Sequence, residues 1–337
     1  MPAPRKLLAA MQEVAETLRG GGLVAFPTET VYGLGADAEN PAAVARIFAV
    51  KGRPADHPLI VHIANRDQIT RWAEDTPPAA WRLARRYWPG PLTLILRRAC
   101  RVSNIVTGGQ DTVGLRVPDH PLALALLEAF GGGIAAPSAN RFGRVSPTTA
   151  AHVREELGDV LDLVLDGGPC RVGIESTILD LSGHQPRLLR PGAITIAEIE
   201  AVLEQPIAQP GNDAPRAPGM LRSHYAPKTP VCLVPATDLE AEARRRLAQG
   251  QRVAVLAMSA TLLAEACLRQ DLPTRPAGWA RELYARLRAL DAQSFDCILI
   301  EAPPMVADWQ AVRDRLERAA SAHGASGGFA SMGRQPF

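Results

Sequence analysis

The feature that most constrains this chain is a proline-rich stretch well past its middle, between Gln205 and Pro230. Its prolines are Pro206, Pro210, Pro215, Pro218, Pro227 and Pro230. Because proline fixes φ and donates no backbone hydrogen bond, neither a continuous helix nor a central strand can cross this stretch. The length of 337 residues also exceeds what one compact core usually holds. We therefore predict two domains joined by an extended, semi-rigid connector, whose composition alone is that of a passive linker.

The two sides of the connector differ in pattern. In residues 1–204, short apolar runs typical of strands alternate with helical patterns, which predicts a twisted mixed α/β sheet. In residues 231–321, three buried-strand candidates are each followed by a helical segment: Val231–Pro235, Val253–Ala257 and Cys297–Glu301. This pattern predicts a smaller three-layer α/β domain with a parallel sheet. The predicted organisation is thus domain 1–204, connector 205–230, domain 231–321 and a frayed tail, 322–337.

Composition excludes several classes of protein. The formal net charge of +2 argues against a surface built chiefly to grip nucleic acid. The five cysteines form no CxxC pair, so we expect reduced thiols in a cytoplasmic protein rather than a zinc site or a disulfide framework. The N-terminal run is amphipathic and lacks a signal-peptide cleavage site, and no stretch is apolar enough to span a membrane.

Familiar nucleotide motifs are missing. The sequence contains no GxxxxGK[ST] loop, no HExxH, no GxSxG and no GxGxxG after a strand. Any nucleotide is therefore bound outside the standard P-loop and Rossmann arrangements. No Ser/His/Asp triad or pair of catalytic carboxylates emerges either, so positioning and charge neutralisation are favoured over a covalent nucleophile.

Two polar runs follow predicted strands or helices near the N-terminus. Residues 27–35, PTETVYGLG, come directly after a strand and are either a ligand loop or a tight turn in which Gly33 and Gly35 supply unusual backbone angles. Lys51 and Arg53 close a helix and either clamp a polyphosphate or complement the helix dipole. His62 ends an apolar strand, where it is either a satisfied core histidine or a substrate ligand.

Three further runs carry candidate groups. Arg116 interrupts an apolar strand, so it pairs either with an internal carboxylate or with a ligand carboxylate. Ser138 and Asn140 follow a strand of small residues, and Ser146 or Thr148 is expected to cap the next helix. Residues 173–178, GIESTI, and the later RPG at 190–192 form the last run. Small, hydroxyl and basic groups thus recur at strand ends, which suits a nucleotide plus a small polar substrate.

Taken in order, these motifs resemble a known family. The runs PTETVYGLG, KGRP, HPLIVHI, WPGPLTLIL, DTVGLRVP, AAPSAN, SPT, ESTI and LRPG are similar to those of YrdC-like threonylcarbamoyl-AMP synthases. The match covers roughly residues 7–203, and APGMLRSHYAPKTP resembles the connector of the longer two-domain members. The resemblance implies a nucleotidyltransferase that joins L-threonine, bicarbonate and ATP into threonylcarbamoyl-AMP and releases pyrophosphate. The product then serves separate proteins that modify an adenosine in tRNA.

The resemblance also implies roles for residues. Two basic residues would hold the triphosphate and act as the catalytic groups, with a histidine near them: Lys51, Arg53 and His57. The threonine pocket would consist of Thr30, His62, Arg116, Ala136 (through its backbone) and Ser176. The rest of the nucleotide would lie among Thr112, Ser138, Asn140, Ser146 and Arg190, with Tyr225 of the connector reaching over it as part of a flap. Mg²⁺ would be held mainly by ATP, with no metal ligand from the protein.

One alternative comes from a different class, an RNA-binding module without nucleotide turnover. A basic patch would draw on Arg82, Arg85, Arg86, Arg97, Arg98 and Arg101, although the first three are expected on the solvated face of one helix. Weak tRNA contact is compatible with either function. Carbamoyl transfer in metal-enzyme maturation ranks third, because such chains carry zinc-finger-like segments and this one has no CxxC.

Overall fold

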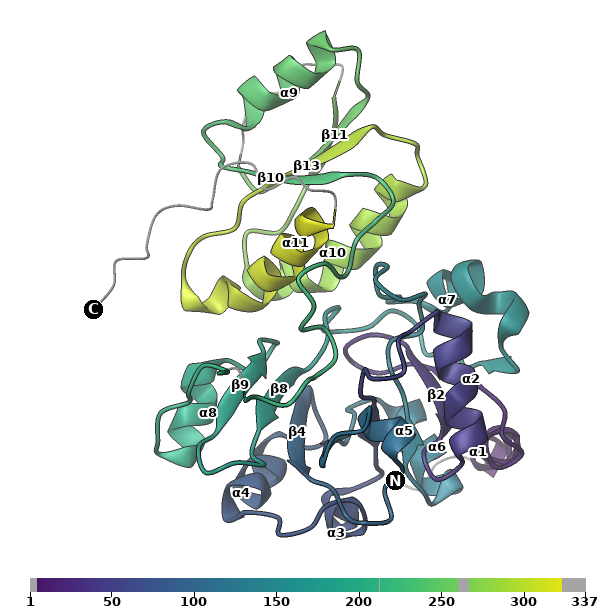
Figure 1. The fold of residues 1–337 in the computed structure, drawn as a ribbon. Coiled ribbons are helices and arrows are strands. Elements are labelled where there is room, and N and C mark those ends of the chain that lie inside the picture. The colour runs from purple at the N-terminus through teal and green to yellow at the C-terminus, as the bar shows by residue number, and fades with distance from the viewer. Residues whose placement is uncertain (1–4, 212, 260–266, 323–337) are drawn as a thin grey trace. The chain divides into compact units, whose positions relative to one another are not determined.

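The structure is a computed structural model that describes residues 5–211, 213–259 and 267–322. It divides into two compact units (Figure 1). The N-terminal unit comprises residues 1–142 and 146–220, and the C-terminal unit comprises residues 143–145 and 221–337. Most of the predicted tail, 323–337, lies outside the described residues.

The N-terminal unit is built on a nine-stranded sheet with the order β7-β1-β2-β6-β3-β5-β4-β8-β9. In sequence, its strands are β1 (Val24–Phe26), β2 (Gly33–Asp37), β3 (Ile60–His62), β4 (Leu92–Arg97), β5 (Thr112–Arg116), β6 (Ile134–Ala135), β7 (Leu163–Val164), β8 (Thr177–Asp180) and β9 (Arg187–Arg190). Parallel pairs such as β3/β5 and β4/β8 alternate with antiparallel pairs such as β4/β5 and β8/β9. The predicted mixed sheet is confirmed.

The glycines of PTETVYGLG have a different role from the one their turn-like pattern suggests. Gly33 and Gly35 lie in strand β2, which pairs antiparallel with β1. A Cβ on Gly35 would come within 2.8 Å of both the Ile134 and the Phe26 side chains. The expectation of unusual backbone angles is therefore wrong: this glycine is required by close packing between strands.

Helices surround this sheet. They are α1 (Arg5–Arg19), α2 (Pro41–Lys51), α3 (Ile69–Trp72), α4 (Pro78–Tyr87), α5 (Asn104–Thr107), α6 (Pro121–Phe130), α7 (Ala150–Leu157) and α8 (Ile196–Leu203), with 3₁₀ turns η1 (Arg66–Gln68) and η2 (Gly158–Val160). Helix α2 shows how sequence sets their ends. Asn40 accepts from the N–H groups of Ala42 and Ala43 at its start, and Gly52 ends it in the left-handed conformation.

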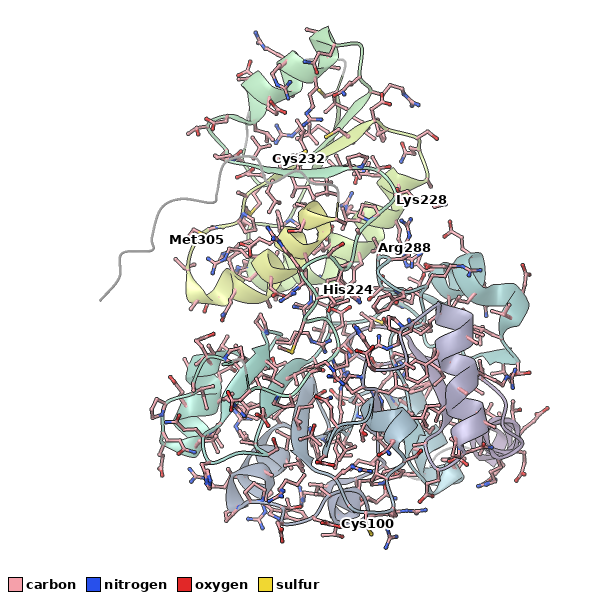
Figure 2. All side chains as sticks on the ribbon, viewed as in Figure 1. Cys100, His224, Lys228, Cys232, Arg288 and Met305 are labelled. Atoms are coloured by element: carbon pink, nitrogen blue, oxygen red, sulfur yellow. The ribbon has the colours of Figure 1, made fainter. Side chains whose placement is uncertain are left out.

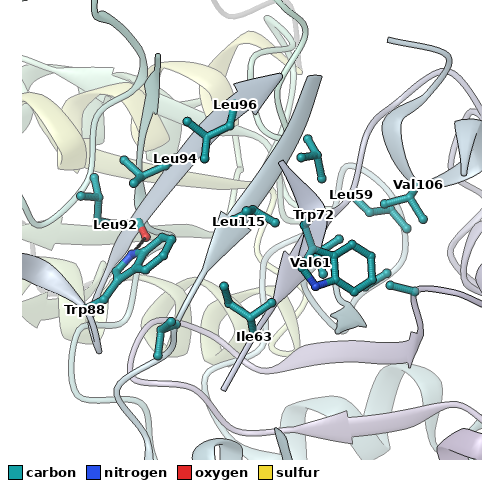
Figure 3. Close-up of a cluster of buried hydrophobic side chains, with 14 of the residues drawn as sticks. Leu59, Val61, Ile63, Trp72, Trp88, Leu92, Leu94, Leu96, Val106 and Leu115 are labelled. Carbon is teal, nitrogen blue, oxygen red and sulfur yellow. Dashed lines mark hydrogen bonds between the residues drawn. The ribbon is translucent and has the colours of Figure 1, made fainter. Parts of the chain in front are cut away.

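The central strands of this sheet have two different faces, because side chains alternate along a strand. On one face Val61, Leu94 and Leu115 belong to the main hydrophobic core, with Trp72 and Trp88 (Figure 3). On the other face lie His62, Thr93 and Arg116, one residue out of step with those core positions. A buried polar surface therefore occupies the face opposite the main core.

A smaller apolar cluster adjoins this polar surface and involves the connector. Ile60, Ile95, Ile178 and Leu189 pack with Ala217, while Ala214 and Met220 lie against the same cluster. Residues 214–220 therefore cover part of the sheet face that carries the polar side chains. This middle part of the connector is packed against the N-terminal unit, so the passive-linker interpretation is wrong for residues 214–220.

The C-terminal unit contains a four-stranded parallel sheet with the order β10-β13-β11-β12, which confirms the predicted parallel sheet. Its elements are β10 (Val231–Val234), α9 (Leu239–Ala248), β11 (Val253–Ala257), β12 (Leu268–Asp271), α10 (Pro276–Asp291), β13 (Cys297–Glu301), η3 (Ala307–Trp309) and α11 (Gln310–Ser321). Helix α9 covers one face, and α10 and α11 cover the other (Figure 1). Among the described residues, no helix has the length and apolarity needed to cross a membrane.

Candidate active site

A row of polar groups crosses the middle of the N-terminal sheet. His62 at the end of β3 and Arg116 at the end of β5 are direct neighbours in the parallel register. Ala136, directly after β6, lies beside β3 two residues before His62, where its N–H donates to Ile60 O at 2.9 Å. Thr93 in β4 continues the row on the other side, and its Oγ1 lies 2.8 Å from the Ser176 Oγ. We call Ala136, His62, Arg116, Thr93 and Ser176 the polar row; it unites all the predicted threonine-binding residues except Thr30.

Arg116 has an internal carboxylate partner. Its Nη2 lies 2.7 Å from Glu29 Oε1, and the two side chains are only 5% and 2% exposed. Glu29 also accepts from Asp119 N–H at 3.0 Å, while Arg116 Nε donates to Gly90 O at 3.3 Å. The buried charge is therefore compensated by Glu29, and a ligand carboxylate is not needed to explain it. Sequence reasoning missed Glu29, although an acidic residue within the otherwise uncharged run PTETVYGLG was its signal.

His62 is buried and electrically neutral. Burial, assisted by the neighbouring Arg116 charge, lowers its pKa to about 3. Its ring packs edge-on against Phe26, with centroids 5.8 Å apart. Within the described part of the chain, Nδ1 has no hydrogen-bond partner. Because buried polar atoms are nearly always paired, this histidine differs from a satisfied core residue and retains hydrogen-bonding capacity in the polar row.

Two basic residues lie at the C-terminal end of α2. Lys51 Nζ donates to Ser138 O at 2.6 Å and also to Asn140 O, so it fastens the loop that follows β6. Burial, reinforced by the charge of Arg53, holds the Lys51 pKa well below its usual value. An ammonium has three donors, of which these contacts use two. The predicted nucleotide residues Lys51, Ser138 and Asn140 thus come together in space.

Arg53 and His57 share an aromatic neighbour that sequence reasoning did not select. The Arg53 guanidinium carbon lies 5.6 Å from the centroid of the Phe142 ring, and the His57 ring packs edge-on against that ring at 5.3 Å. Arg53 Nη2 also donates to Pro58 O at 2.9 Å. Burial and the Arg53 charge lower the pKa of His57. Phe142 follows AAPSAN closely, and its N–H donates to Lys51 O at 2.8 Å.

Arg190 connects the polar row to the connector. Its Nε donates to Ser176 O at 3.0 Å and its Nη2 to the Ser176 Oγ at 3.1 Å. Its Nη1 donates to Pro218 O at 3.0 Å. A guanidinium presents five donors in a fixed fork, so one side chain holds both partners at once. Arg190, predicted on the nucleotide side, therefore lies directly beside the end of the row.

Three residues predicted to bind substrate, Ser146, Thr30 and Thr112, lie in the following surroundings. Ser146 donates to Glu175 Oε1 at 2.6 Å, both side chains being buried. The cap of α7 is Thr149, which accepts from His152 N–H, so the expectation that Ser146 or Thr148 caps this helix is wrong. Thr30 is fully buried, with its Oγ1 2.8 Å from Thr28 Oγ1. Thr112 begins β5 and is half-buried.

The connector is anchored to the N-terminal unit through Arg216. Its Nε donates to Asp56 O at 3.2 Å and its Nη2 to Gly108 O at 2.9 Å. Its backbone exchanges two hydrogen bonds with the Gln110 side chain, of 2.6 and 3.1 Å. This segment is polar and proline-rich, so nothing in its local sequence revealed these contacts.

Tyr225 belongs to the C-terminal unit. It is 1% exposed, stacks on Tyr284 with centroids 5.8 Å apart, and contacts the His224 ring at 4.2 Å. The Arg315 guanidinium carbon lies 5.2 Å from its ring centroid. Its backbone φ is +62°, a left-handed conformation that is strained for a bulky residue. The tyrosine is thus held by packing within its own unit.

Two of the six basic residues of the RNA-binding alternative lie in ion pairs. Arg82, Arg85 and Arg86 are exposed on α4, as expected for a solvated helix face. Arg82 lies 3.5 Å from Glu204 Oε2, and Arg98 lies 3.4 Å from Asp111 Oδ1. These ion pairs reduce the positive field that a phosphate backbone would meet.

Comparisons with known proteins agree with this architecture. Residues 16–192 match the Sua5_yciO_yrdC family, described as "Telomere recombination", and residues 194–321 match the threonylcarbamoyl-AMP synthase C-terminal domain. Threonylcarbamoyl-AMP synthase of Pyrococcus abyssi is 42% identical over 90% of this chain and 91% of its own length. Threonylcarbamoyl-AMP synthase of Bacillus subtilis is 43% identical over 91% of this chain and 92% of its own length.

A solved structure extends the likeness to three dimensions. The crystal structure of P. abyssi Sua5 complexed with L-threonine matches with a TM-score of 0.88 and 41% identity, covering 93% of this chain and 95% of the other. The agreement spans both units and includes the mixed sheet and the parallel sheet. The chain therefore belongs to the threonylcarbamoyl-AMP synthase family, in its long, two-domain form.

Proposed function

We propose that this chain forms threonylcarbamoyl-AMP and pyrophosphate from L-threonine, bicarbonate and ATP, as the names of its relatives imply. The observation that carries the proposal is the buried polar row, which places a charged arginine and a neutral histidine side by side on one sheet face. Burying such groups is costly unless they serve a ligand or one another. A relative crystallised with L-threonine shares this fold at 41% identity.

Threonine would bind along the polar row. The substrate carboxylate would accept from Arg116, whose position is set by Glu29. The guanidinium would then lie between the Glu29 carboxylate and the substrate carboxylate. Neutral His62 and the hydroxyls of Thr30 and Ser176 offer partners for the amine and the hydroxyl of the amino acid. The Ala136 N–H is already bonded to Ile60 O, so a backbone contact at that residue would come from its carbonyl.

ATP would bind at the end of α2. Lys51 uses two of its three ammonium donors on Ser138 O and Asn140 O, and Arg53 adds a second positive charge beside it, which suits triphosphate oxygens. His57 and the ring of Phe142 border the same place. Ser138, Asn140, Ser146, Thr112 and Arg190 would contact the rest of the nucleotide. Arg190, which already holds Ser176, would link the two substrates and so align the reacting groups.

The chemistry requires positioning more than a protein nucleophile. The threonine amine adds to bicarbonate and loses water to give a carbamate. One carbamate oxygen then attacks the α-phosphorus, forming a P–O bond while the bond to the pyrophosphate oxygen breaks. Mg²⁺ arriving with ATP would neutralise charge on the phosphates. Among the described residues, no three or more His, Cys, Asp or Glu side chains gather in one place. We propose that ATP carries the metal.

The connector would act as a flap over the bound substrates. Residues 214–220 already lie against the sheet face that carries the polar row, and Arg190 reaches Pro218 O. The product would pass to the proteins that modify tRNA, in the cytoplasm, where no disulfide framework is expected.

The reaction itself is the first test. The purified protein is incubated with ATP, Mg²⁺, bicarbonate and one amino acid at a time, and pyrophosphate and the AMP adduct are measured. We expect pyrophosphate release that requires both threonine and bicarbonate, together with an adduct of the mass of threonylcarbamoyl-AMP. Absence of turnover with every amino acid, together with tight, salt-dependent RNA binding, would favour the RNA-binding module instead.

The flap has a test of its own. Arg216→Ala removes the side-chain bonds to Asp56 O and Gly108 O, so we expect a several-fold loss of kcat/KM without unfolding. Arg222→Ala, at an exposed position of the same connector, is the matched control. Equal activity of the two variants would show that the anchored connector takes no part in turnover.

A further inference from the structure

Two cysteines lie side by side in the C-terminal sheet. Neither belongs to the polar row or to the unit that carries it. Cys232 is in β10 and Cys297 in β13, and their sulfur atoms are 3.8 Å apart, with the Cys297 thiol donating to Cys232 Sγ. Cys297 is buried, whereas Cys232 (labelled in Figure 2) is partly exposed. The pair therefore combines a partly exposed cysteine with a buried one that acts as its hydrogen-bond donor.

A guanidinium from the helix above completes this arrangement. Arg246 in α9 donates from Nη2 to Cys232 Sγ at 3.3 Å. Its Nε is held by Glu242 Oε1 at 2.7 Å, and Glu242 in turn takes two donors of Arg245. The Cys232 sulfur thus receives two hydrogen bonds, one of them from a cation whose orientation is fixed by a carboxylate.

The net effect of the charged and titratable groups that face this sulfur is to favour its thiolate form. They are Arg245, Arg246 and Glu242 from α9 and Cys297 from β13. The hydrogen bond from Cys297 and the positive charge of Arg246 outweigh burial and the opposing Glu242, and lower the pKa of Cys232 to about 6. The same contact raises the pKa of Cys297. Of the two thiols, Cys232 is thus the one whose thiolate form is favoured, and Cys297 is its hydrogen-bond donor.

We propose that Cys232 is a thiol-modification site that exchanges with low-molecular-weight disulfides. The Cys232 thiolate attacks one sulfur of the small disulfide, forming a new S–S bond while the old one breaks. The departing half leaves as a thiolate and takes a proton from water. One disulfide bond is replaced by another, so the step needs no further oxidant. An excess of small thiol reverses it.

Strand register prevents Cys297 from resolving the mixed disulfide. Cys232 pairs with Leu299, and Val231 with Ile298, so Cys297 lies two positions out of register with Cys232. Strand spacing and rise then place their Cα atoms roughly 8 Å apart. A disulfide needs Cα atoms within about 7 Å, so the two cysteines cannot join without moving a strand of the sheet. The adduct on Cys232 therefore persists until a thiol removes it.

The first experiment measures reactivity in the full-length native protein. Brief treatment with iodoacetamide from pH 5 to 9, followed by peptide mass spectrometry, gives the alkylation rate at each cysteine. Cys100 is exposed on the N-terminal unit and is the internal reference, because a rate set by access alone would favour it (Figure 2). We expect Cys232 to react at least about tenfold faster than Cys100 at pH 6.5. A slower rate at Cys232 across the whole range would overturn the proposal.

Matched variants test the geometry. Arg246→Gln keeps a polar side chain but removes the charge, and should slow Cys232 alkylation at pH 5.5 by about tenfold through a higher thiol pKa. Arg244→Gln changes an exposed arginine of the same helix that pairs with Glu240, and should leave the rate unchanged. Equal rates in the two variants, with circular dichroism showing both folded, would contradict a role for Arg246.

The final experiment uses oxidised glutathione as the disulfide. We expect one glutathione on Cys232, removed by dithiothreitol and absent from Cys232→Ser. An internal Cys232–Cys297 disulfide would overturn the persistent adduct that the register predicts. Absence of any adduct on Cys232, in protein whose alkylation is fast, would show that the site excludes disulfides.

Discussion

The two units treat buried polar groups differently. The N-terminal unit buries a large set of polar and charged side chains, among them Glu29, Lys51, His62, Arg116 and Arg190. Within the described residues, the C-terminal unit buries only His224, Thr229, Glu301 and Arg315. Since each such group costs free energy unless it is paired, this concentration is consistent with our proposal that the substrates bind in the N-terminal unit.

The buried carboxylates show the same contrast at single residues. Glu29 pairs with Arg116, a side chain of the polar row that can also serve a ligand. Glu301 at the end of β13 accepts from Met258 N–H, Ser259 N–H and the Ser259 hydroxyl, so it fastens the loop after β11. Glu29 thus positions the Arg116 guanidinium, whereas Glu301 accepts hydrogen bonds from loop N–H groups that have no strand partner. Variants at these two residues therefore separate binding from scaffolding.

Arg116→Ala should have the largest effect. It removes the proposed partner of the threonine carboxylate, so the KM for threonine should rise by about a hundredfold or more, while the KM for ATP changes little. It also leaves Glu29 buried and unpaired, which should lower the free energy of unfolding by about 3–5 kcal/mol. Steady-state kinetics and urea denaturation measure the two effects. Arg154→Ala, which breaks an exposed ion pair, is the control.

Glu29→Gln should have a smaller effect of the same kind. The amide keeps the shape of the side chain but removes the charge that orients Arg116, so we expect about a tenfold rise in threonine KM. The kcat at saturating threonine should fall less. If stability dropped but threonine KM stayed at the wild-type value, Glu29 would be a structural partner only.

Glu301→Gln should change stability and leave kinetics alone. Loss of a charged acceptor for three donors should lower the free energy of unfolding by about 1–3 kcal/mol. Both KM values should remain within about twofold of wild type if the two units differ as described. A threonine KM as high as that of Glu29→Gln would remove the distinction between the units.

His62→Gln should change how stability depends on pH. The folded pKa of about 3 lies below the ordinary value of about 6.5, so the folded state resists protonation of this residue. The stability it contributes is complete above about pH 6.5 and declines by up to about 1.4 kcal/mol per pH unit as the pH falls toward 3. Urea midpoints between pH 7 and 4 should therefore fall less steeply in His62→Gln. His184→Gln, at an exposed position, is the reference. If the pH dependence of the urea midpoint were the same in both variants, His62 would not be the cause of the pH-dependent stability.

Where the sequence has a clear capping motif or a continuous apolar run, it predicted the bounds of helices and strands well. The helical pattern of the sequence predicts a helix over Ile196–Leu203, and α8 has these bounds, because Thr195 and Glu198 form a reciprocal capping box at its start. Strands β11 and β13 are apolar throughout and were predicted at their observed bounds. Strand β12, with the sequence LRQD, was missed because an edge strand that is partly exposed needs no apolar pattern.

The sequence by itself determined the two-part organisation, the mixed and parallel sheets, the family and a set of candidate residues, because these depend on local propensity and on motifs read in order. Only the tertiary structure decided which groups meet. Glu29 reaches Arg116 and Arg216 reaches Gly108 across 87 and 108 residues of chain, respectively, and Cys232 reaches Arg246 across strand and helix. Such contacts arise from strand order and register, which bring together residues that no local pattern connects.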